Sequence, residues 1–255
     1  MEDLDTPRVV PGCADAILRT LESFGLTWDG EVVWQSRRTA LYRAAAAQLQ
    51  SKGLTFECSC PRRLRLENED RGYPGTCRDK PVPVVTAPGS TATRFRIDEA
   101  TVTIDDRFQG CCELPLGPMG DVVIRRRDGI FAYQLAVVVD DADQGVTAVV
   151  RGADLLSSTG WQVCLQRALN VISPSYAHLP LIVEPDGTKL SKTRRSIALD
   201  PARSALLLLD ALQLLGQASA PGLEFEAPQS ILSWAVEHWD PKPLRGIRSR
   251  PALRT

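Results

Sequence analysis

The chain has 255 residues, of which 44% are hydrophobic and 24% are charged, and its formal net charge is -1. These values are typical of a globular protein with a substantial core, and they argue against a generally basic nucleic-acid coat protein. No apolar run approaches the ~20 residues that span a bilayer, and the acidic start MEDLDTPR is not a signal-peptide pattern. The seven cysteines, an odd number, fit a reducing cytoplasm better than a disulfide framework.

The first hundred residues predict two helices followed by extended chain. Apolar spacing predicts a helix over 11–26, PGCADAILRTLESFGL. A second helix is expected over 37–53, RRTALYRAAAAQLQSKG, where alanine favours the helix and Gly53 ends it. After a cysteine-rich segment, the prolines and glycine of 80–97 forbid a helix and indicate extended chain.

The rest of the chain predicts strands alternating with helices. DVVIRRRDG, 121–129, is expected to be a strand entering a turn. GVTAVVRGADLL, 145–156, is expected to be a strand that runs into a helix over 158–169, with Ser158 or Thr159 as its N-cap. Two more helices are expected beyond residue 200, at 202–216 and 228–239. This order predicts an α/β core followed by a small helical domain.

Three cysteines in CSCPRRLRLENEDRGYPGTC, residues 58–77, have the spacing of a metal site. Tetrahedral zinc needs four ligands, and the two histidines, His178 and His238, lie far downstream. The candidates for a fourth ligand beside Cys58, Cys60 and Cys77 are Tyr73, Glu57, Glu67, Glu69 and Asp70. A phenolate is chemically feasible because a bound dication can remove the proton of a ligand. Spacing alone leaves these candidates open, together with three unrelated cysteines.

A second pattern lies in HLPLIVEPDGTKLSKTRRS, 178–196. Lys189 and Lys192 flank Leu190-Ser191 in a loop opened by a Pro-Asp-Gly turn. Two ammonium groups with a hydroxyl between them can neutralise a triphosphate as charge builds on its leaving group. The alternative is an ordinary solvated basic loop. The run K-L-S-K-T resembles the K-M-S-K-S signature loop of class I aminoacyl-tRNA synthetases.

Other segments carry the same resemblance in the same order. EDLDTPRVVPG, WDGEVVWQS, RRDGIFAYQLAVVVDD, GVTAVVRGADLL and YAHLPLI resemble a bacterial glutamyl-tRNA synthetase catalytic domain. With the C-x-C…Y-x3-C element, residues 2 to about 240 resemble the glutamyl-Q tRNA(Asp) synthetase group. The resemblance implies an α/β fold, with a class I Rossmann-type catalytic domain, a zinc-binding insert and a small helical C-terminal domain. It also implies one structural zinc per chain, held by Cys58, Cys60, Tyr73 and Cys77.

The resemblance divides the chain into four regions. Residues 1–55 would be a partial nucleotide-binding fold, and 56–120 a zinc-binding insert with an acceptor-like subdomain. Residues 121–200 would be the second half of the catalytic fold with the signature loop. Residues 201–255 would form a helical C-terminal region.

The resemblance implies ATP-dependent activation of glutamate, with Mg2+, and its transfer to the queuosine base of tRNA(Asp). The expected partners are L-glutamate, ATP and tRNA(Asp) carrying queuosine, and the chain is expected to act as a monomer away from membranes. Residues 193–255 are too few for the anticodon-binding region of a full glutamyl-tRNA synthetase. Two alternatives remain: a glutamyl-tRNA synthetase fragment that charges the tRNA 3′ end, and a non-enzymatic zinc and RNA-binding remnant.

Individual roles follow from matching positions. Glu2 resembles the acid that meets the substrate's ammonium group, Tyr133 the pocket tyrosine that hydrogen-bonds the substrate, and Arg151 the arginine that binds its side-chain carboxylate. Lys192 resembles the lysine that stabilises the triphosphate, with Lys189 as the second catalytic lysine of the loop.

Each of these positions also has a simpler explanation. Glu2 could be a frayed N-terminal charge, Tyr133 a core aromatic and Arg151 half of a surface ion pair with Asp154. His178 would lie near the nucleotide or be a packed structural histidine.

One motif of the family is not in the printed sequence. Class I enzymes carry an H-I-G-H-type turn that binds the ATP phosphates, and in this family it precedes the segment that matches EDLD. The chain as printed is therefore expected to lack a central strand and a phosphate-binding helix N-terminus, and to activate glutamate poorly.

Overall fold

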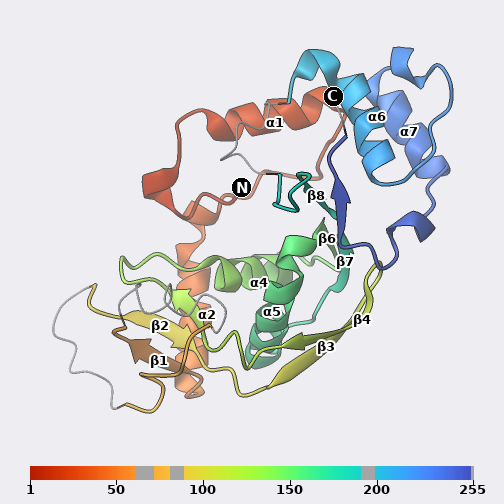
Figure 1. The fold of residues 1–255 in the computed structure, drawn as a ribbon. Coiled ribbons are helices and arrows are strands. Elements are labelled where there is room, and N and C mark those ends of the chain that lie inside the picture. The colour runs from red at the N-terminus through yellow and green to blue at the C-terminus, as the bar shows by residue number, and fades with distance from the viewer. Residues whose placement is uncertain (61–71, 81–88, 191–198, 254–255) are drawn as a thin grey trace.

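In this computed structural model the described residues are 1–60, 72–80, 89–190 and 199–253, and they form an α/β fold (Figure 1). The helices are α1 (Cys13–Ser23), α2 (Thr39–Ser51), α4 (Tyr133–Asp143), α5 (Leu156–Leu169), α6 (Ser204–Leu214) and α7 (Pro228–Glu237). The strands are β1 (Thr55–Cys58), β2 (Ala92–Phe95), β3 (Thr101–Asp106), β4 (Gly110–Pro115), β5 (Val122–Arg125), β6 (Ala148–Gly152), β7 (Ser175–Leu179), β8 (Leu181–Val183) and β9 (Ser249–Pro251). Within these ranges no helix is both long enough and apolar enough to cross a membrane.

The main sheet has the strand order β4-β3-β7-β6. β3 and β4 form an antiparallel hairpin, whereas β7 runs parallel to both β3 and β6. The carboxyl ends of β3, β7 and β6 therefore lie at one edge of the sheet, the usual place for a ligand in a parallel sheet. The sheet combines β3 and β4 from the predicted 56–120 region with β6 and β7 from the 121–200 region.

Helices α2, α4 and α5 pack together and α5 also packs on β3 and β4, which places the main core between the helices and the sheet (Figure 1). The largest fully buried side chains of this core include Leu49, Leu116, Ile124, Leu135 and Leu165. Helix α5 contacts the sheet closely, because a Cβ at Gly160 would lie 2.7 Å from Leu116 Cδ2. A bulkier residue there would push the helix away from the sheet.

A separate three-stranded antiparallel sheet, β1-β2-β5, carries the cysteine segment. β1 ends at Cys58, and the loop that contains Tyr73 returns to the backbone of 118–120. A Cβ at Gly72 would lie 2.4 Å from Met119 O, and one at Gly120 would lie 2.3 Å from Tyr73 O. Both glycines have positive φ, so neither side of this contact can carry a side chain without displacement.

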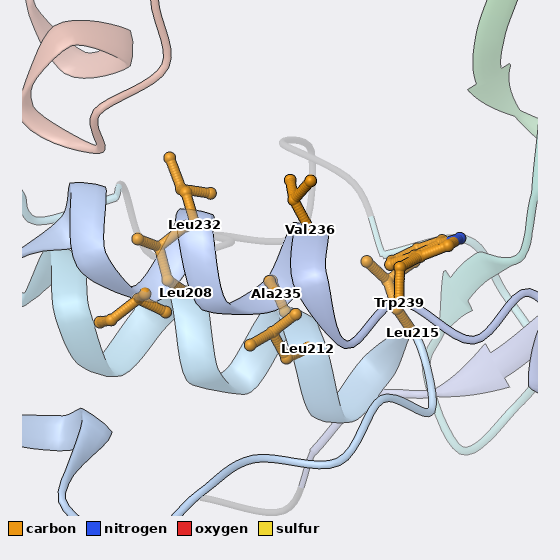
Figure 2. Close-up of a pocket in the computed structure, with 9 residues that line it drawn as sticks. Leu208, Leu212, Leu215, Leu232, Ala235, Val236 and Trp239 are labelled. Carbon is orange, nitrogen blue, oxygen red and sulfur yellow. The ribbon is translucent and has the colours of Figure 1, made fainter.

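The C-terminal helices form a second small core. Leu208 and Leu212 of α6 and Ile231 of α7 pack with Phe24, which caps α1. β9 returns to pair in parallel with β8. Side chains of both α6 and α7 line a pocket of about 400 Å³ (Figure 2), among them Leu208, Leu212, Leu232, Ala235 and Val236, together with Leu215 and Trp239.

Most of the predicted elements are confirmed. α1, α2, α6 and α7 lie within the predicted helical ranges, and β5, β6 and α5 follow the predicted strand and strand-to-helix segments. The predicted N-cap of α5 is wrong. The helix begins at Leu156, and Thr159 lies inside it with its hydroxyl donating to Leu155 O. Helix α4 and the β3-β4 hairpin were not predicted.

A buried carboxylate ties the N-terminal segment to α4. Tyr42 Oη donates to Asp140 Oδ2 (2.8 Å), and Arg38 Nε donates to Asp140 Oδ1 (2.7 Å). Gln35 Nε2 also donates to Oδ2 at 2.8 Å. The Asp140 side chain is only 7% exposed, so these donors replace the water that the charge gives up.

We expect Asp140→Ala to lower the free energy of unfolding by about 3–5 kcal/mol, because it leaves Gln35, Tyr42 and the Nε of Arg38 without their acceptor. The measurement is urea unfolding followed by circular dichroism. Asp143→Ala is the matched control: Asp143 pairs with the same arginine but is 50% exposed, so its loss should cost below about 1 kcal/mol. Equal effects of the two changes would contradict the structural role of Asp140.

Candidate functional site

Arg151, at the end of β6, is held by side chains from two neighbouring elements. Its Nη2 donates to Thr159 Oγ1 (2.8 Å) and Gln162 Oε1 (2.7 Å), both on α5. Its Nε donates to His178 Nε2 on β7 (3.2 Å). The Tyr176 ring lies beside the guanidinium, with 5.4 Å between Cζ and the ring centroid. Arg151 therefore has a fixed position at the carboxyl edge of the sheet.

His178 is buried against Asp106, the last residue of β3. Both side chains are fully buried, and His178 Nδ1 lies 2.6 Å from Asp106 Oδ2. Burial lowers the pKa of His178 and outweighs the opposing influence of Asp106, so the imidazole is neutral at pH 7. Burial alone would raise the pKa of Asp106, but hydrogen bonds from the Gln109 N–H and from His178 lower it.

Tyr133, Glu2 and Asp141 share their surroundings with Arg151. Burial raises the pKa of Tyr133, while the charge of Arg151 and a hydrogen bond from it lower that pKa. The carboxylates of Glu2 and Asp141 raise it further. Burial also raises the pKa of Asp141, opposed by Arg151 and supported by Asp140 and Glu2. Arg151, Tyr133, Glu2 and Asp141 thus lie near enough for the charge of each to act on the others.

The residues on either side of Glu2 are hydrogen-bonded, which contradicts a frayed N-terminal charge. The amino group of Met1 donates to Val33 O (2.6 Å), and Gln35 N–H donates to Met1 O (3.1 Å). Asp3 accepts from the N–H (2.9 Å) and the hydroxyl (2.5 Å) of Ser36.

The other two simpler explanations also differ from the structure. Tyr133 is half-buried rather than part of the closed core. Asp154 pairs with Lys189, whereas Arg151 donates to His178, Thr159 and Gln162.

The lysine loop begins as a hairpin after β8. Val183 bridges to Lys189, and Gly187 forms the predicted turn with φ +80°. The Lys189 ammonium group pairs with Asp154, just after β6. Lys192 lies outside the described residues, so its position relative to the site is not part of this geometry.

The three cysteines of the predicted metal site do come together. The Sγ atoms of Cys58, Cys60 and Cys77 all lie within 4.8 Å of one another. The sulfurs of Cys60 and Cys77 are 3.4 Å apart, too far for a disulfide of about 2.05 Å. In a tetrahedral site with Zn–S bonds of about 2.3 Å, two sulfurs lie about 3.8 Å apart. The donor set therefore fits zinc.

Tyr73 lies beside this sulfur cluster. Its Oη is 3.6 Å from Cys58 Sγ and accepts a hydrogen bond from the Cys77 N–H at 2.8 Å. The Arg94 guanidinium lies over the Tyr73 ring, with Cζ 3.8 Å from the ring centroid. Glu57 instead accepts hydrogen bonds from Thr91 and Thr93. The candidates Glu67, Glu69 and Asp70 lie outside the described residues.

The cysteines differ in their electrostatic surroundings. Burial alone would raise the pKa of Cys77, but the Ser59 N–H and the Cys60 and Tyr73 side chains lower it to about 7. Burial and the Cys77 contact raise the pKa of Cys60 to about 11. Of Cys60 and Cys77, Cys77 thus forms the thiolate more readily, and the thiolate is the form that binds metals.

Several residues of the site were not identified from the sequence. They are Asp106, Asp141, Thr159, Gln162 and Tyr176. The alternation of Val102, Ile104 and Asp106 along β3 is the one signal that could have indicated a buried carboxylate. The others lie on elements that only the fold brings near Arg151.

Comparison with known proteins gives the family. The sequence signature described as tRNA synthetases class I (E and Q), catalytic domain, matches residues 1–216. A protein of Ectopseudomonas mendocina called glutamyl-Q tRNA(Asp) synthetase is 52% identical and covers 98% of this chain and 83% of its own length. A protein of the same name from Pseudomonas entomophila is 49% identical and covers 94% of this chain and 80% of its own length. Another from Dechloromonas aromatica is 46% identical and covers 99% of this chain and 86% of its own length.

Two solved structures share the fold. A glutamate tRNA ligase from Elizabethkingia meningosepticum, in complex with its amino acid, has a TM-score of 0.74 at 21% identity. The glutamate-tRNA synthetase of Elizabethkingia anophelis also has a TM-score of 0.74, at 22% identity. They match 99% and 98% of this chain, which spans 59% and 60% of theirs. The chain therefore belongs to the class I tRNA synthetases for glutamate and glutamine, a family of ligases, and within them to the group called glutamyl-Q tRNA(Asp) synthetases.

Proposed function

We propose that the chain activates glutamate with ATP and transfers the glutamyl group to the queuosine base of tRNA(Asp). The observation that carries the proposal is the site around Arg151, where the guanidinium is held by three hydrogen bonds and lies within electrostatic range of Tyr133, Glu2 and Asp141. Glutamate offers the complementary groups, a side-chain carboxylate and an ammonium group. The names of the relatives support queuosine-bearing tRNA(Asp) as the acceptor.

In this proposal the protein's own groups orient glutamate. Two of the Arg151 nitrogens, Nε and Nη2, already donate to His178, Thr159 and Gln162. Nη1 is therefore the atom that would meet the substrate's side-chain carboxylate. Glu2 and Asp141 would meet the ammonium group, and Tyr133 would donate or accept a hydrogen bond beside them. Such positioning lowers the barrier because the reacting carboxyl group is held towards ATP before the reaction begins.

The ATP side of the reaction rests on the lysine loop. Lys192 is proposed to stabilise the triphosphate as charge develops on the leaving pyrophosphate. Lys189 would have to leave Asp154 before it could contact a phosphate.

Zinc is proposed as a structural ion, held by Cys58, Cys60, Cys77 and Tyr73. Four protein ligands leave no open coordination position, so the ion would order the loop and take no part in the reaction. The close approach of Gly72 to residues 118–119 and of Gly120 to Tyr73 fixes the backbone of the segment that would supply the phenol.

Transfer is tested with radiolabelled glutamate, ATP and three tRNAs. Label should appear on tRNA(Asp) that carries queuosine, and not on tRNA(Asp) with unmodified guanosine or on tRNA(Glu). The ester should survive removal of the tRNA 3′ end by nuclease, because the acceptor lies in the anticodon. Label on tRNA(Glu) that is lost with its 3′ end would support the glutamyl-tRNA synthetase alternative.

Arg151→Ala tests the amino-acid site. Removing one side of a buried, hydrogen-bonded charge pair costs on the order of 2–5 kcal/mol, so glutamate-dependent ATP–pyrophosphate exchange should fall at least about tenfold. The loss should appear mainly as a higher KM for glutamate. The matched control is Arg167→Ala, an arginine that is 53% exposed and pairs with Glu99. If Arg151→Ala binds glutamate as the parent does, the placement of the substrate is wrong.

Metal content tests the zinc site. Elemental analysis should find one zinc per chain, and Tyr73→Phe should retain the thiolates but lose zinc to a chelator at a lower concentration. Glu57→Gln is the control. The Glu57 carboxylate already accepts hydrogen bonds from Thr91 and Thr93, so this substitution should not affect zinc retention. Protein purified with zinc in the medium but essentially free of the metal would refute the site. Unchanged retention in Tyr73→Phe would remove Tyr73 from the ligand set.

A further inference from the structure

We propose that Asp106 and His178 are a positioning pair that orients Arg151 for the substrate's side-chain carboxylate. The inference rests on the proposed function of Arg151 and adds to it two residues that never touch the substrate. The pair and Arg151 lie on three adjacent strands, β3, β7 and β6, at the carboxyl edge of the main sheet. Arg151 and His178 are direct register partners in β6 and β7.

Asp106 is itself fixed by the backbone. Its Oδ1 accepts hydrogen bonds from the N–H groups of Phe108 (3.0 Å), Gln109 (2.9 Å) and His178 (3.1 Å). These bonds close the turn after β3 and tie it to β7. Its Oδ2 remains for the His178 ring, at 2.6 Å from Nδ1.

This arrangement sets the tautomer of His178. A carboxylate can only accept, so the proton of the neutral imidazole must be on Nδ1, and Nε2 is then an acceptor. The Arg151 Nε always carries hydrogen and lies 3.2 Å from Nε2. The opposite tautomer would place two donors face to face.

The hydroxyl of Thr159 does not compete with Arg151 as the donor to His178 Nε2. Its oxygen lies 3.2 Å from Nε2, but it donates to Leu155 O (3.1 Å) and accepts from Arg151 Nη2 (2.8 Å). Arg151 is thus clamped on Nε by the Asp106–His178 pair and on Nη2 by α5. Loss of either clamp would let the guanidinium turn away from the substrate.

The tautomer can be measured directly, because the chain has only two histidines, His178 and His238. In protein labelled with 15N-histidine, NMR should show His178 as the Nδ1–H tautomer near pH 7. Asp106→Asn keeps Oδ1 for the three backbone donors but presents an amide donor to Nδ1. It should therefore convert His178 to the Nε2–H tautomer and leave the exposed His238 unchanged. A parent spectrum with Nε2–H would overturn the proposal.

Glutamate affinity is the second readout, measured by calorimetry and as KM in ATP–pyrophosphate exchange. Asp106→Asn should raise the KM for glutamate by about tenfold or more, the effect of losing a hydrogen bond to a charged group. The KM for ATP should not change. A purely structural role would instead lower stability and leave the two KM values in proportion.

Two replacements of His178 separate its two nitrogens. The amide of glutamine reaches the position of Nε2, where its oxygen can accept from Arg151. The shorter asparagine reaches only the position of Nδ1, where its NH2 group can donate to Asp106. His178→Gln should therefore lose clearly less glutamate affinity than His178→Asn. In the His178→Gln background, Asp106→Asn should have little further effect, since no tautomer remains to be set. Equal losses in the two replacements would overturn the proposal.

The proposal and the proposed function fail in different ways. If Arg151→Ala leaves glutamate affinity unchanged, the proposed function is wrong and the pair loses its role with it. If Arg151→Ala weakens glutamate binding but Asp106→Asn does not, only the positioning pair is wrong. Circular dichroism and the His238 signal verify that each variant is folded before either comparison is made.

Discussion

The parallel pairing of β6 with β7 is the constraint on which the site depends. Its register places Arg151 opposite His178, and the adjacent β3 brings Asp106 to the same edge. A shift of one residue would turn Arg151 to the other face of the sheet, away from α5. The core cluster around α5 also includes Tyr176 of β7, with Val149 of β6 packed against it, so the core and the site are parts of one packing arrangement.

The N-terminal segment depends on a second buried charge. Asp140 holds Gln35, Arg38 and Tyr42 against α4, and α4 also carries Tyr133 and Asp141. The bonds of Met1 and Asp3 to residues 33–36 then bring Glu2 to the same helix. The site thus joins groups from the start of the chain with groups from its middle, and the link between them is a buried carboxylate that makes no contact with a substrate in our proposal.

The sequence was informative where the chemistry lies within a few residues. The cysteine spacing, the K-L-S-K-T loop and the strand before Arg151 are local patterns, and the described parts of each fold as predicted. Helix α4 was missed because Val137, Val138 and Val139 favour a strand, while packing against α2 and α5 makes this segment helical. The Asp106–His178 contact was missed because the two residues are 72 positions apart.

The contact between Gly72 and Gly120 gives the sulfur cluster an unusual vulnerability. A Cβ on either glycine would lie within 2.4 Å of a carbonyl oxygen of the facing segment, and a backbone oxygen cannot turn aside as a flexible side chain can. A substitution of Gly120 would therefore displace the Tyr73 loop, although Gly120 supplies no sulfur and no phenol. Metal retention would thus depend partly on Gly72 and Gly120, which supply no ligand. A survey of ligand positions alone would overlook them.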